Sequence, residues 1–182
     1  SLAHYIYNSL RKTQQPSDGV LLLMSSAISL SEILAEYLIN INDRELYLFV
    51  GLDDIEIAEV NRVANERRRE LVLLGKNVSG IELVKITPLK KEKRREAYIK
   101  GGFYTLTAGI VILDLLSGSE LPSQLITKIF FRDCEHVKTY KDQLAWINHL
   151  TRVEGDSPFS INNHTQTIVI SQRVSRLTVT TF

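Results

Sequence analysis

The strongest constraint on the fold is a set of short apolar runs that alternate along the chain with helix-like segments. Several runs are apolar at every position, as expected for strands that are buried on both faces of a sheet. Because a helical pattern follows most of the runs, successive strands can pair in parallel through right-handed crossovers. We therefore expect an α/β fold with a parallel, doubly wound sheet. The expected strands are residues 20–24, 46–50, 81–86, 102–106 and 126–131.

Helical periodicity indicates what connects these strands. Ile57, Val60 and Ala64 recur near the spacing of one helix face. The sequence Ser-Leu-Ser-Glu at 29–32 matches the capping box S-x-x-E, which begins a helix. The expected helices are residues 2–12, 30–40, 54–74, 108–116 and 137–150.

Length and composition limit the possible classes of protein. The 182 residues are enough for one domain, and the net charge of +1 is typical neither of an obvious polyanion binder nor of an acidic protein. No run approaches about 18 apolar residues, so we expect no membrane partner. Patterning weakens after Gly155, so we assign 1–155 to one lobe and 156–182 to the start of a following segment. The chain ends inside an apolar run, which suggests a piece of a longer protein.

The turn after the first strand lacks the groups of an ATP site. In a P-loop, G-x-x-x-x-G-K-[ST] surrounds the phosphates with backbone N–H groups and a lysine. No glycine or lysine occurs between Ser25 and Ser31, which leaves Ser25, Ser26, Ser29 and Ser31 as a degenerate nucleotide site. We expect this strand inside the sheet, with the degenerate turn at its carboxyl end and no nucleotide cofactor.

In ATPases that share such a P-loop frame, a later strand ends in D-E-A-H, whose acid pair holds Mg²⁺, and the strand at 126–131 is the one to compare. Here the four positions hold Arg132, Asp133, Cys134 and Glu135, so an arginine stands in the place of the metal-binding acid. A shifted register would group Asp133, Glu135 and His136 as metal ligands. Three ligand types within four residues cannot converge from a strand end without a special turn. We therefore expect a solvated strand end and no metal.

Three motifs follow one another in the second half of the chain. A Gly-Gly pair opens the strand at 102–106, an Ile-Leu-Asp-Leu-Leu helix covers 108–116, and Leu-Pro-Ser-Gln-Leu-Ile-Thr spans 121–127. This succession resembles the N-terminal helicase-like region of the XPF family of structure-specific DNA endonucleases. The resemblance covers roughly residues 19–150 and is strongest over 95–131.

The resemblance implies a RecA-like, superfamily-two helicase lobe that has lost its ATPase motifs. It implies a nuclear parent protein that cuts DNA in nucleotide excision and crosslink repair, as a heterodimer with a smaller noncatalytic subunit. It also implies docking of repair scaffold proteins. The nuclease signature G-D-x(n)-E-R-K-x-x-x-D is absent from these residues, so we expect no cleavage by this chain alone.

Two other interpretations remain open. The chain could be a degenerate helicase or ATPase lobe of another protein that acts only as a protein-interaction platform. An active enzyme, such as a small-molecule transferase, has little support because no catalytic constellation is legible.

Clusters of positive charge are the candidate DNA contacts, because a nearly neutral chain binds a polyanion only through a local excess of cations. The alternative is an ordinary solvated surface. We expect weak, sequence-independent binding to fork or junction DNA. The candidate cations are Arg67, Arg68, Arg69, Lys90, Lys91, Lys93, Arg94, Arg95 and Lys100.

Thr105 and Thr107 occupy the place where helicases touch the DNA backbone, and hydroxyls at a helix start suit phosphate. Thr107 can equally cap the helix that begins at residue 108. Tyr98, Phe103 and Tyr104 adjoin the basic run and could stack on bases, although core packing is the simpler interpretation.

Overall fold

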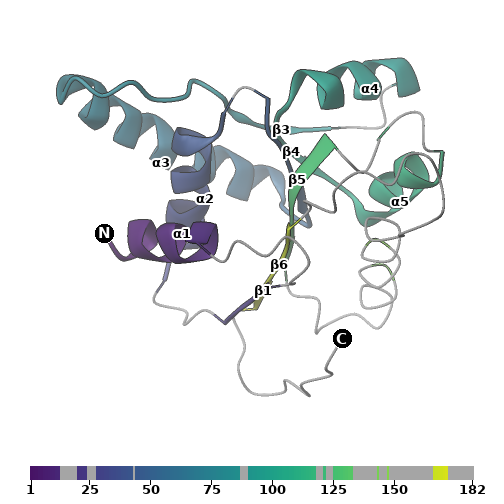
Figure 1. Ribbon diagram of the computed structural model, residues 1–182, viewed down its shortest axis with the longest axis horizontal. Helices are drawn as coiled ribbons and strands as arrows, with labels where there is room; N and C mark the ends of the chain where they lie inside the picture. Colours follow the sequence, from purple (N-terminus) through teal and green to yellow (C-terminus); the bar gives the residue numbers. More distant parts are fainter. Residues whose placement is uncertain are drawn as a thin grey trace.

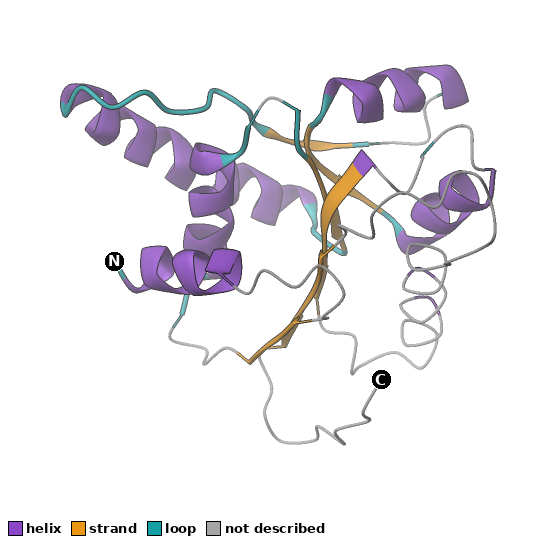
Figure 2. Cartoon of the chain, in the orientation of Figure 1, coloured by secondary structure: helices purple, strands orange, loops and turns teal. Residues whose placement is uncertain are grey.

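The computed structural model shows one parallel sheet with helices packed against both of its faces (Figure 1). Figure 2 distinguishes the helices from the strands that they cover. The structure describes residues 1–12, 20–23, 28–42, 44–86, 90–117, 121, 125–132, 143, 147 and 166–171.

The described strands form a six-stranded sheet in the order β1-β6-β5-β2-β4-β3, and every neighbouring pair is parallel. This confirms the expected parallel sheet. In the middle of the sheet, Phe49 aligns with Thr105 on one side and with Phe130 on the other. The strands are β1 Val20–Leu23, β2 Leu46–Val50, β3 Leu83–Lys85, β4 Gly102–Leu106, β5 Ile126–Arg132 and β6 Gln166–Ser171.

The position of β1 corrects the expected strand order. Among the described strands β1 lies at an edge of the sheet, not inside it, because β6 pairs with both β1 and β5. Ile168 of β6 aligns with Val20 on one side and with Phe130 on the other. Six residues beyond the expected boundary at 155 therefore belong to this sheet, and we had expected no strand among them.

Helices α1, α2 and α3 cover one face of the sheet, and α4 and α5 cover the other (Figure 1). Four of them agree with the expected helices to within one residue. The fifth, α4, covers the basic run and was not among the expected helices. The expected helix at 137–150 falls almost entirely outside the described residues. The helices are α1 Leu2–Lys12, α2 Leu30–Asn40, α3 Asp54–Leu73, α4 Lys91–Lys100 and α5 Ala108–Ser117.

Side chains of the central strands alternate between two cores. In β2, Tyr47 and Phe49 pack with the α1–α3 layer, whereas Leu46, Leu48 and Val50 pack with the α4–α5 layer. All five are buried, as a strand covered on both faces requires. The continuous run of apolar residues in β2 is thus explained by the burial of this strand on both faces.

Local hydrogen bonds fix both ends of α3. At its start, Glu56 N–H donates to Asp53 Oδ1 over 2.8 Å, and Asp53 N–H donates to Glu56 Oε2 over 3.1 Å, which completes a capping box. At its end, Gly75 has a φ of +70° and donates to Val72 O, while Lys76 donates to Leu71 O. This pair of bonds is a Schellman motif, which glycine permits at little cost.

One side chain of α3 covers the outer edge of β3. Asn61 Nδ2 donates to Leu83 O over 2.9 Å, and Leu83 N–H donates to Asn61 Oδ1 over 2.9 Å. The amide therefore takes the place of a neighbouring strand. Such a cover blocks the edge-to-edge pairing to which exposed strand edges are prone.

Replacing Asn61 with alanine should lower the free energy of unfolding by about 2 kcal/mol, because it leaves two partly buried backbone groups of Leu83 without these bonds. Urea unfolding of the two proteins measures the difference. Asn77→Ala, at an exposed position, serves as the control and should leave the midpoint unchanged. Equal midpoints for Asn61→Ala and the native protein would contradict the role of this amide.

A lysine lies among aromatic rings where β5 meets α2. Lys128 Nζ is 6.0 Å from the ring centroid of Tyr37, whose ring also makes edge contacts with Tyr7 and Phe130. Burial lowers the pKa of Lys128 to about 8; nearby Glu45 opposes this shift and Arg11 adds to it.

This lowered pKa predicts a pH-dependent stability. Below about pH 8 the lysine is charged in both states, so the full cost of burying the charge applies. Between about pH 8 and about 10.4, the unfolded chain holds a proton that the folded chain has released, so stability rises with pH. We expect Lys128→Met to be more stable than the native protein at pH 7 and to lose this rise. Urea midpoints between pH 7 and 10 measure it, and parallel curves for the two proteins would contradict it.

Candidate functional site

The carboxyl ends of the strands meet at one edge of the sheet, which is where ligands bind in folds of this kind. Arg132 ends β5 at this edge, and the N-terminal turn of α3 follows β2 there. Arg132 forms an ion pair with Glu56 in that turn. At the end of β3, Lys85 Nζ lies 2.6 Å from Asp54 Oδ1 of the same turn.

These two ion pairs determine what the edge can do chemically. The cation in the expected acid position is neutralised by a carboxylate of the chain itself. Glu56 is doubly engaged, since it also accepts the N–H of Asp53 in the capping box. Both partners of the Arg132–Glu56 pair are about three-quarters buried, with side chains 23% and 27% exposed. Glu56 was not among our candidates, because only the parallel sheet brings it to Arg132.

The expected nucleotide residues are only partly described. Ser29 begins α2: its Oγ accepts the N–H of Glu32 over 3.4 Å, which confirms the N-cap of the expected capping box. Ser31 is half-buried in the first turn of α2. Ser25, Ser26 and Asp133 lie outside the described residues. Local capping therefore satisfies the helix end that would hold a phosphate in a P-loop.

Metal binding and membrane insertion find no support in the described part of the chain. It contains no group of three His, Cys, Asp or Glu side chains placed to hold a metal ion. The alternative ligand set Asp133, Glu135 and His136 lies outside it. None of its helices is long and apolar enough to cross a membrane.

Most of the candidate cations in α4 and at its N-cap, Lys90, are exposed. They are Lys90, Lys91, Lys93, Arg95 and Lys100. Our assignment of Arg94 as a DNA contact was wrong, because its side chain is 9% exposed and points into the α4–α5 layer. Thr105 is also buried, at 1% exposure. Thr107 is exposed, and its Oγ1 accepts the N–H of Ile110 over 3.4 Å, so it caps α5.

A buried cluster of Arg94, Tyr98 and Asp114, here called the α4–α5 clamp, holds the basic helix in place. Arg94 donates to both carboxylate oxygens of Asp114, over 2.8 and 2.5 Å, and Tyr98 Oη donates to Asp114 Oδ2 over 2.8 Å. The hydrogen bond with Asp114 raises the pKa of Arg94. The pKa of Tyr98 is raised mainly by burial and, to a smaller extent, by its hydrogen bond with the same carboxylate. A ten-residue helix without a side-chain N-cap is marginal alone, so the clamp anchors it.

The sequence contained a signal for this clamp. Asp114 is the only charged residue of an otherwise apolar helix, and a carboxylate that is forced into a core needs a paired cation. Arg94 and Tyr98 are four residues apart and therefore share one helix face. We had assigned Arg94 to DNA and had not singled out Asp114.

The second basic cluster, Arg67 to Arg69 in α3, is engaged largely in contacts with other groups of the chain. Arg67 forms an ion pair with the buried Glu36, which also accepts a 3.0 Å bond from His4 if that ring is the donor. Arg68 is buried and donates to Ile81 O, so our assignment of this residue as a DNA contact was also wrong. Arg69 is exposed.

The two clusters are not brought together. Helix α3 packs on one face of the sheet, and α4 packs on the other (Figure 1). A DNA strand that follows α4 therefore does not meet the cations of α3 on the same face.

The aromatic candidates for base stacking are part of the core or bonded to the backbone. Tyr98 and Phe103 are buried, and Tyr104 is half-buried with its hydroxyl donating to Gly101 O.

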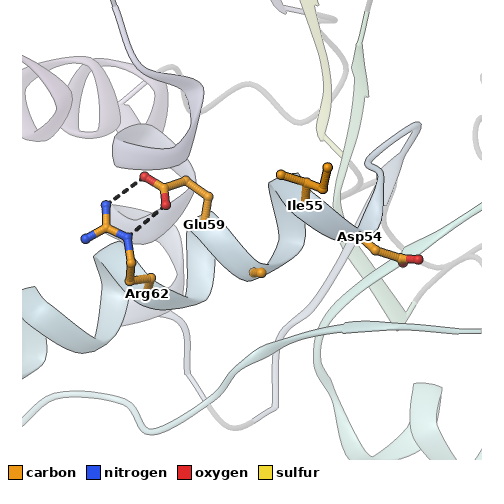
Figure 3. Close-up of a pocket in the computed structure, with 5 residues that line it drawn as sticks. Asp54, Ile55, Glu59 and Arg62 are labelled. Atoms are coloured by element: carbon orange, nitrogen blue, oxygen red, sulfur yellow. Dashed lines mark hydrogen bonds and ion pairs between the residues drawn. The ribbon is translucent and has the colours of Figure 1, made fainter.

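An open hollow lies along the outer side of α3, and Figure 3 shows the side chains that line it. Arg62 bridges Glu59 and Glu66 over 2.7 and 2.6 Å, so its charge is already compensated. Asp54 adds a further carboxylate. The charged lining residues of this hollow are two carboxylates and one cation that is already paired, so it does not suit a phosphate.

Comparisons with known proteins bear on the fold. No protein-family model matches this chain, and no curated protein sequence does. Among solved structures, the helicase domain of Hef from Pyrococcus furiosus matches with a TM-score of 0.62 and 13% sequence identity. The match covers 97% of this chain and 34% of that one, so this chain spans about a third of its length.

The structural match and the sheet topology identify a helicase-like, RecA-type α/β fold. This confirms the expected fold class. At 13% identity the likeness concerns the fold alone, so the assignment to the XPF family stays a prediction.

Breaking the clamp from one side should destabilise the protein strongly. Asp114→Asn removes the carboxylate that pairs with the buried Arg94 guanidinium, and we expect a loss of about 3–5 kcal/mol in urea unfolding. Replacing the whole clamp with apolar side chains, as Arg94→Met, Tyr98→Phe and Asp114→Leu together, should cost much less because no charge remains buried. If the single variant proves at least as stable as the triple variant, the clamp does not anchor α4 as described.

Proposed function

We propose that this chain is a non-catalytic, helicase-like module of a structure-specific DNA repair endonuclease that acts in the nucleus. Its role is to engage fork or junction DNA weakly and to dock other repair proteins. The cutting activity, the smaller noncatalytic subunit and the excision and crosslink repair pathways belong to the proposed parent protein.

The observation that carries this proposal is the Arg132–Glu56 ion pair on a helicase-like sheet. In an active lobe this strand end supplies carboxylates that hold Mg²⁺ against the phosphates of ATP. Here it supplies a cation that is already paired within the chain. The turn that would hold the phosphates has neither glycine nor lysine, which supports the same interpretation.

DNA engagement is supported by the cations that the fold leaves exposed on α4. Lys93 and Lys100 are seven residues apart and lie on one flank of the helix. Phosphate contacts of this kind contribute affinity without reading sequence. Because the candidate cations of α3 lie in the opposite layer, few contacts can act together, which is why we expect weak binding.

The alternative is a degenerate helicase or ATPase lobe of another protein that serves only as a protein-interaction platform. The burial of Arg68, Arg94 and Thr105 favours it, since each removes one candidate DNA contact.

Reversing two cations of α4 separates the two functions. Lys93→Glu with Lys100→Glu should reduce the affinity for single-stranded, duplex and fork DNA alike, because phosphate contacts are lost. The plot of log K against log salt should become less steep: the magnitude of its negative slope should decrease by about 2, close to one unit per lost contact. Fluorescence anisotropy over a salt series measures both quantities.

A matched control carries the same change of charge elsewhere. Arg44→Glu with Lys76→Glu alters two exposed cations outside α4 and should change DNA affinity far less. Equal losses in the two double variants would indicate general electrostatic attraction, and unchanged fork binding in the α4 variant would favour the interaction platform.

A further inference from the structure

Helix α3 carries two highly exposed apolar side chains at opposite ends of one stripe. Ile55 is 80% exposed and Leu73 is 87% exposed, more than any other large apolar side chain in the described part of the chain. They are 18 residues apart, which is five helical turns, so both point away from the face that Val60 and Ala64 bury. A single exposed apolar residue is ordinary, whereas two at matched ends of one stripe suggest a partner.

The stripe between these ends carries four charged side chains of alternating sign, all of which reach solvent. They are, in chain order, Glu59, Arg62, Glu66 and Arg69. From Ile55 to Leu73 the six side chains are spaced by four, three, four, three and four residues. Steps of four and three form the a/d seam of a heptad repeat, along which two helices pack side by side. Figure 3 shows the first half of this seam, from Ile55 to Arg62.

The seam is complementary to itself when its direction is reversed. The signs of the charges then run plus, minus, plus, minus, and the spacing is unchanged. Two copies of α3 packed antiparallel, with Ala64 of each at the same height, therefore place opposite charges at every charged layer. The layers are Ile55 with Leu73, Glu59 with Arg69 and Arg62 with Glu66, where the second residue of each pair belongs to the other copy.

The apolar residues beside the seam agree with the same register. Ala58 and Val72 are exposed on one flank of it, and the antiparallel packing brings Ala58 of one copy to Val72 of the other. Ile55 and Ala58 also line the open hollow on α3 (Figure 3). Leu73 and Val72 of the second copy would therefore cover this hollow.

The remaining carboxylates near the seam do not oppose the packing. Asp54 is paired with Lys85 of its own chain, and Glu56 is paired with Arg132. Glu70 is exposed at the rim, where its charge stays in water and contributes little.

We propose that this seam is the interface of a two-fold, antiparallel dimer of this chain. Each contact occurs twice, as in the isologous interface of a symmetric dimer. The apolar layers at the two ends supply the attraction. The charged layers fix register and direction more than they add affinity, because Arg62 already pairs with Glu59 and Glu66 within its own helix. One helix from each copy buries less area than a standard interface, so we expect a weak, concentration-dependent dimer.

Other occupants fit the seam less well. A polyanion or a polycation would meet as many like charges as opposite ones along it. A second copy in the parallel direction would place Arg62 against Arg62 and Glu66 against Glu66. Only a partner whose charges alternate in the reverse order satisfies the whole seam, and a second copy has that order. This inference goes beyond the proposed function and does not rest on the DNA role.

Disulfide trapping tests the register, in a chain whose native Cys134 is replaced by serine. Ile55→Cys mixed with Leu73→Cys should give a cross-linked dimer under mild oxidation with copper phenanthroline. Either variant alone should give far less, because the antiparallel packing keeps equivalent positions about 27 Å apart. Both positions are highly exposed, so the variants should fold, which circular dichroism checks. Self-cross-linking of Ile55→Cys as efficient as that of the mixture would overturn the antiparallel seam.

A charge exchange gives a second measurement, by sedimentation velocity over a concentration series. Arg62→Glu should weaken the dimer at least about tenfold, equivalent to about 1.4 kcal/mol, because it opposes carboxylates at two layers. Combining Arg62→Glu with Glu66→Arg in one chain should restore association, since the layers regain opposite charges and the net charge is that of the native chain. The matched control is Arg44→Glu, which reverses an exposed cation outside α3 and should leave association unchanged.

The outcomes that overturn this interface are distinct from failure of the DNA function. A chain that stays monomeric at every concentration, or a charge exchange that restores nothing, would reject it. Loss of fork binding in Arg62→Glu without a change in association would reject it and assign the stripe to nucleic acid. Loss of fork binding in the Lys93 and Lys100 variant concerns the other layer of helices and leaves the dimer standing.

Discussion

Burial of the central strands on both faces is the constraint on which the rest of the molecule depends. All five side chains of β2 are buried, and they divide between two cores. Each core needs its own layer of helices, and parallel pairing needs a crossover between successive strands. The carboxyl ends of the strands therefore meet at one edge, whatever chemistry their residues carry.

At that edge and within the helical layers, the chain neutralises much of its own charge. Arg132 pairs with Glu56, Arg67 with Glu36, and Arg94 with Asp114. A charge removed from water without a partner costs several kcal/mol, so each of these cations has to be satisfied internally. The number of basic residues in the sequence thus overstates how many cations a polyanion can reach.

The elements with strong local signals could be predicted from sequence. Helix α2 has a capping serine and an apolar pattern, and β2 and β4 are apolar runs of clear length, so their bounds agree with the structure. Helix α4 could not be predicted from composition, because its stability depends on a contact with Asp114 that is distant in sequence. β6 carries only three consecutive apolar residues, and its place in the sheet depends on pairing with β1 and β5.

The residues of the candidate site also differ in whether local sequence could predict their role. The sequence alone placed Arg132 in the acid position and Ser29 at a helix start, because each depends on a neighbouring strand or helix. It could not separate the exposed Arg95 from the buried Arg94, because adjacent residues on a helix differ only in the direction they face. That direction is decided by tertiary contacts.

The clamp consequently determines what α4 presents to a partner. With Arg94 and Tyr98 turned toward Asp114, one flank of the helix offers Lys93 and Lys100, and the other offers Arg95 and Ile99. Exposed carboxylates accompany both flanks: Glu96 lies between Lys93 and Lys100, and Glu92 lies one turn before Arg95. A rotation of the helix by one residue, about 100°, would turn one of these flanks toward Asp114. A single buried carboxylate thus sets which chemistry faces which direction.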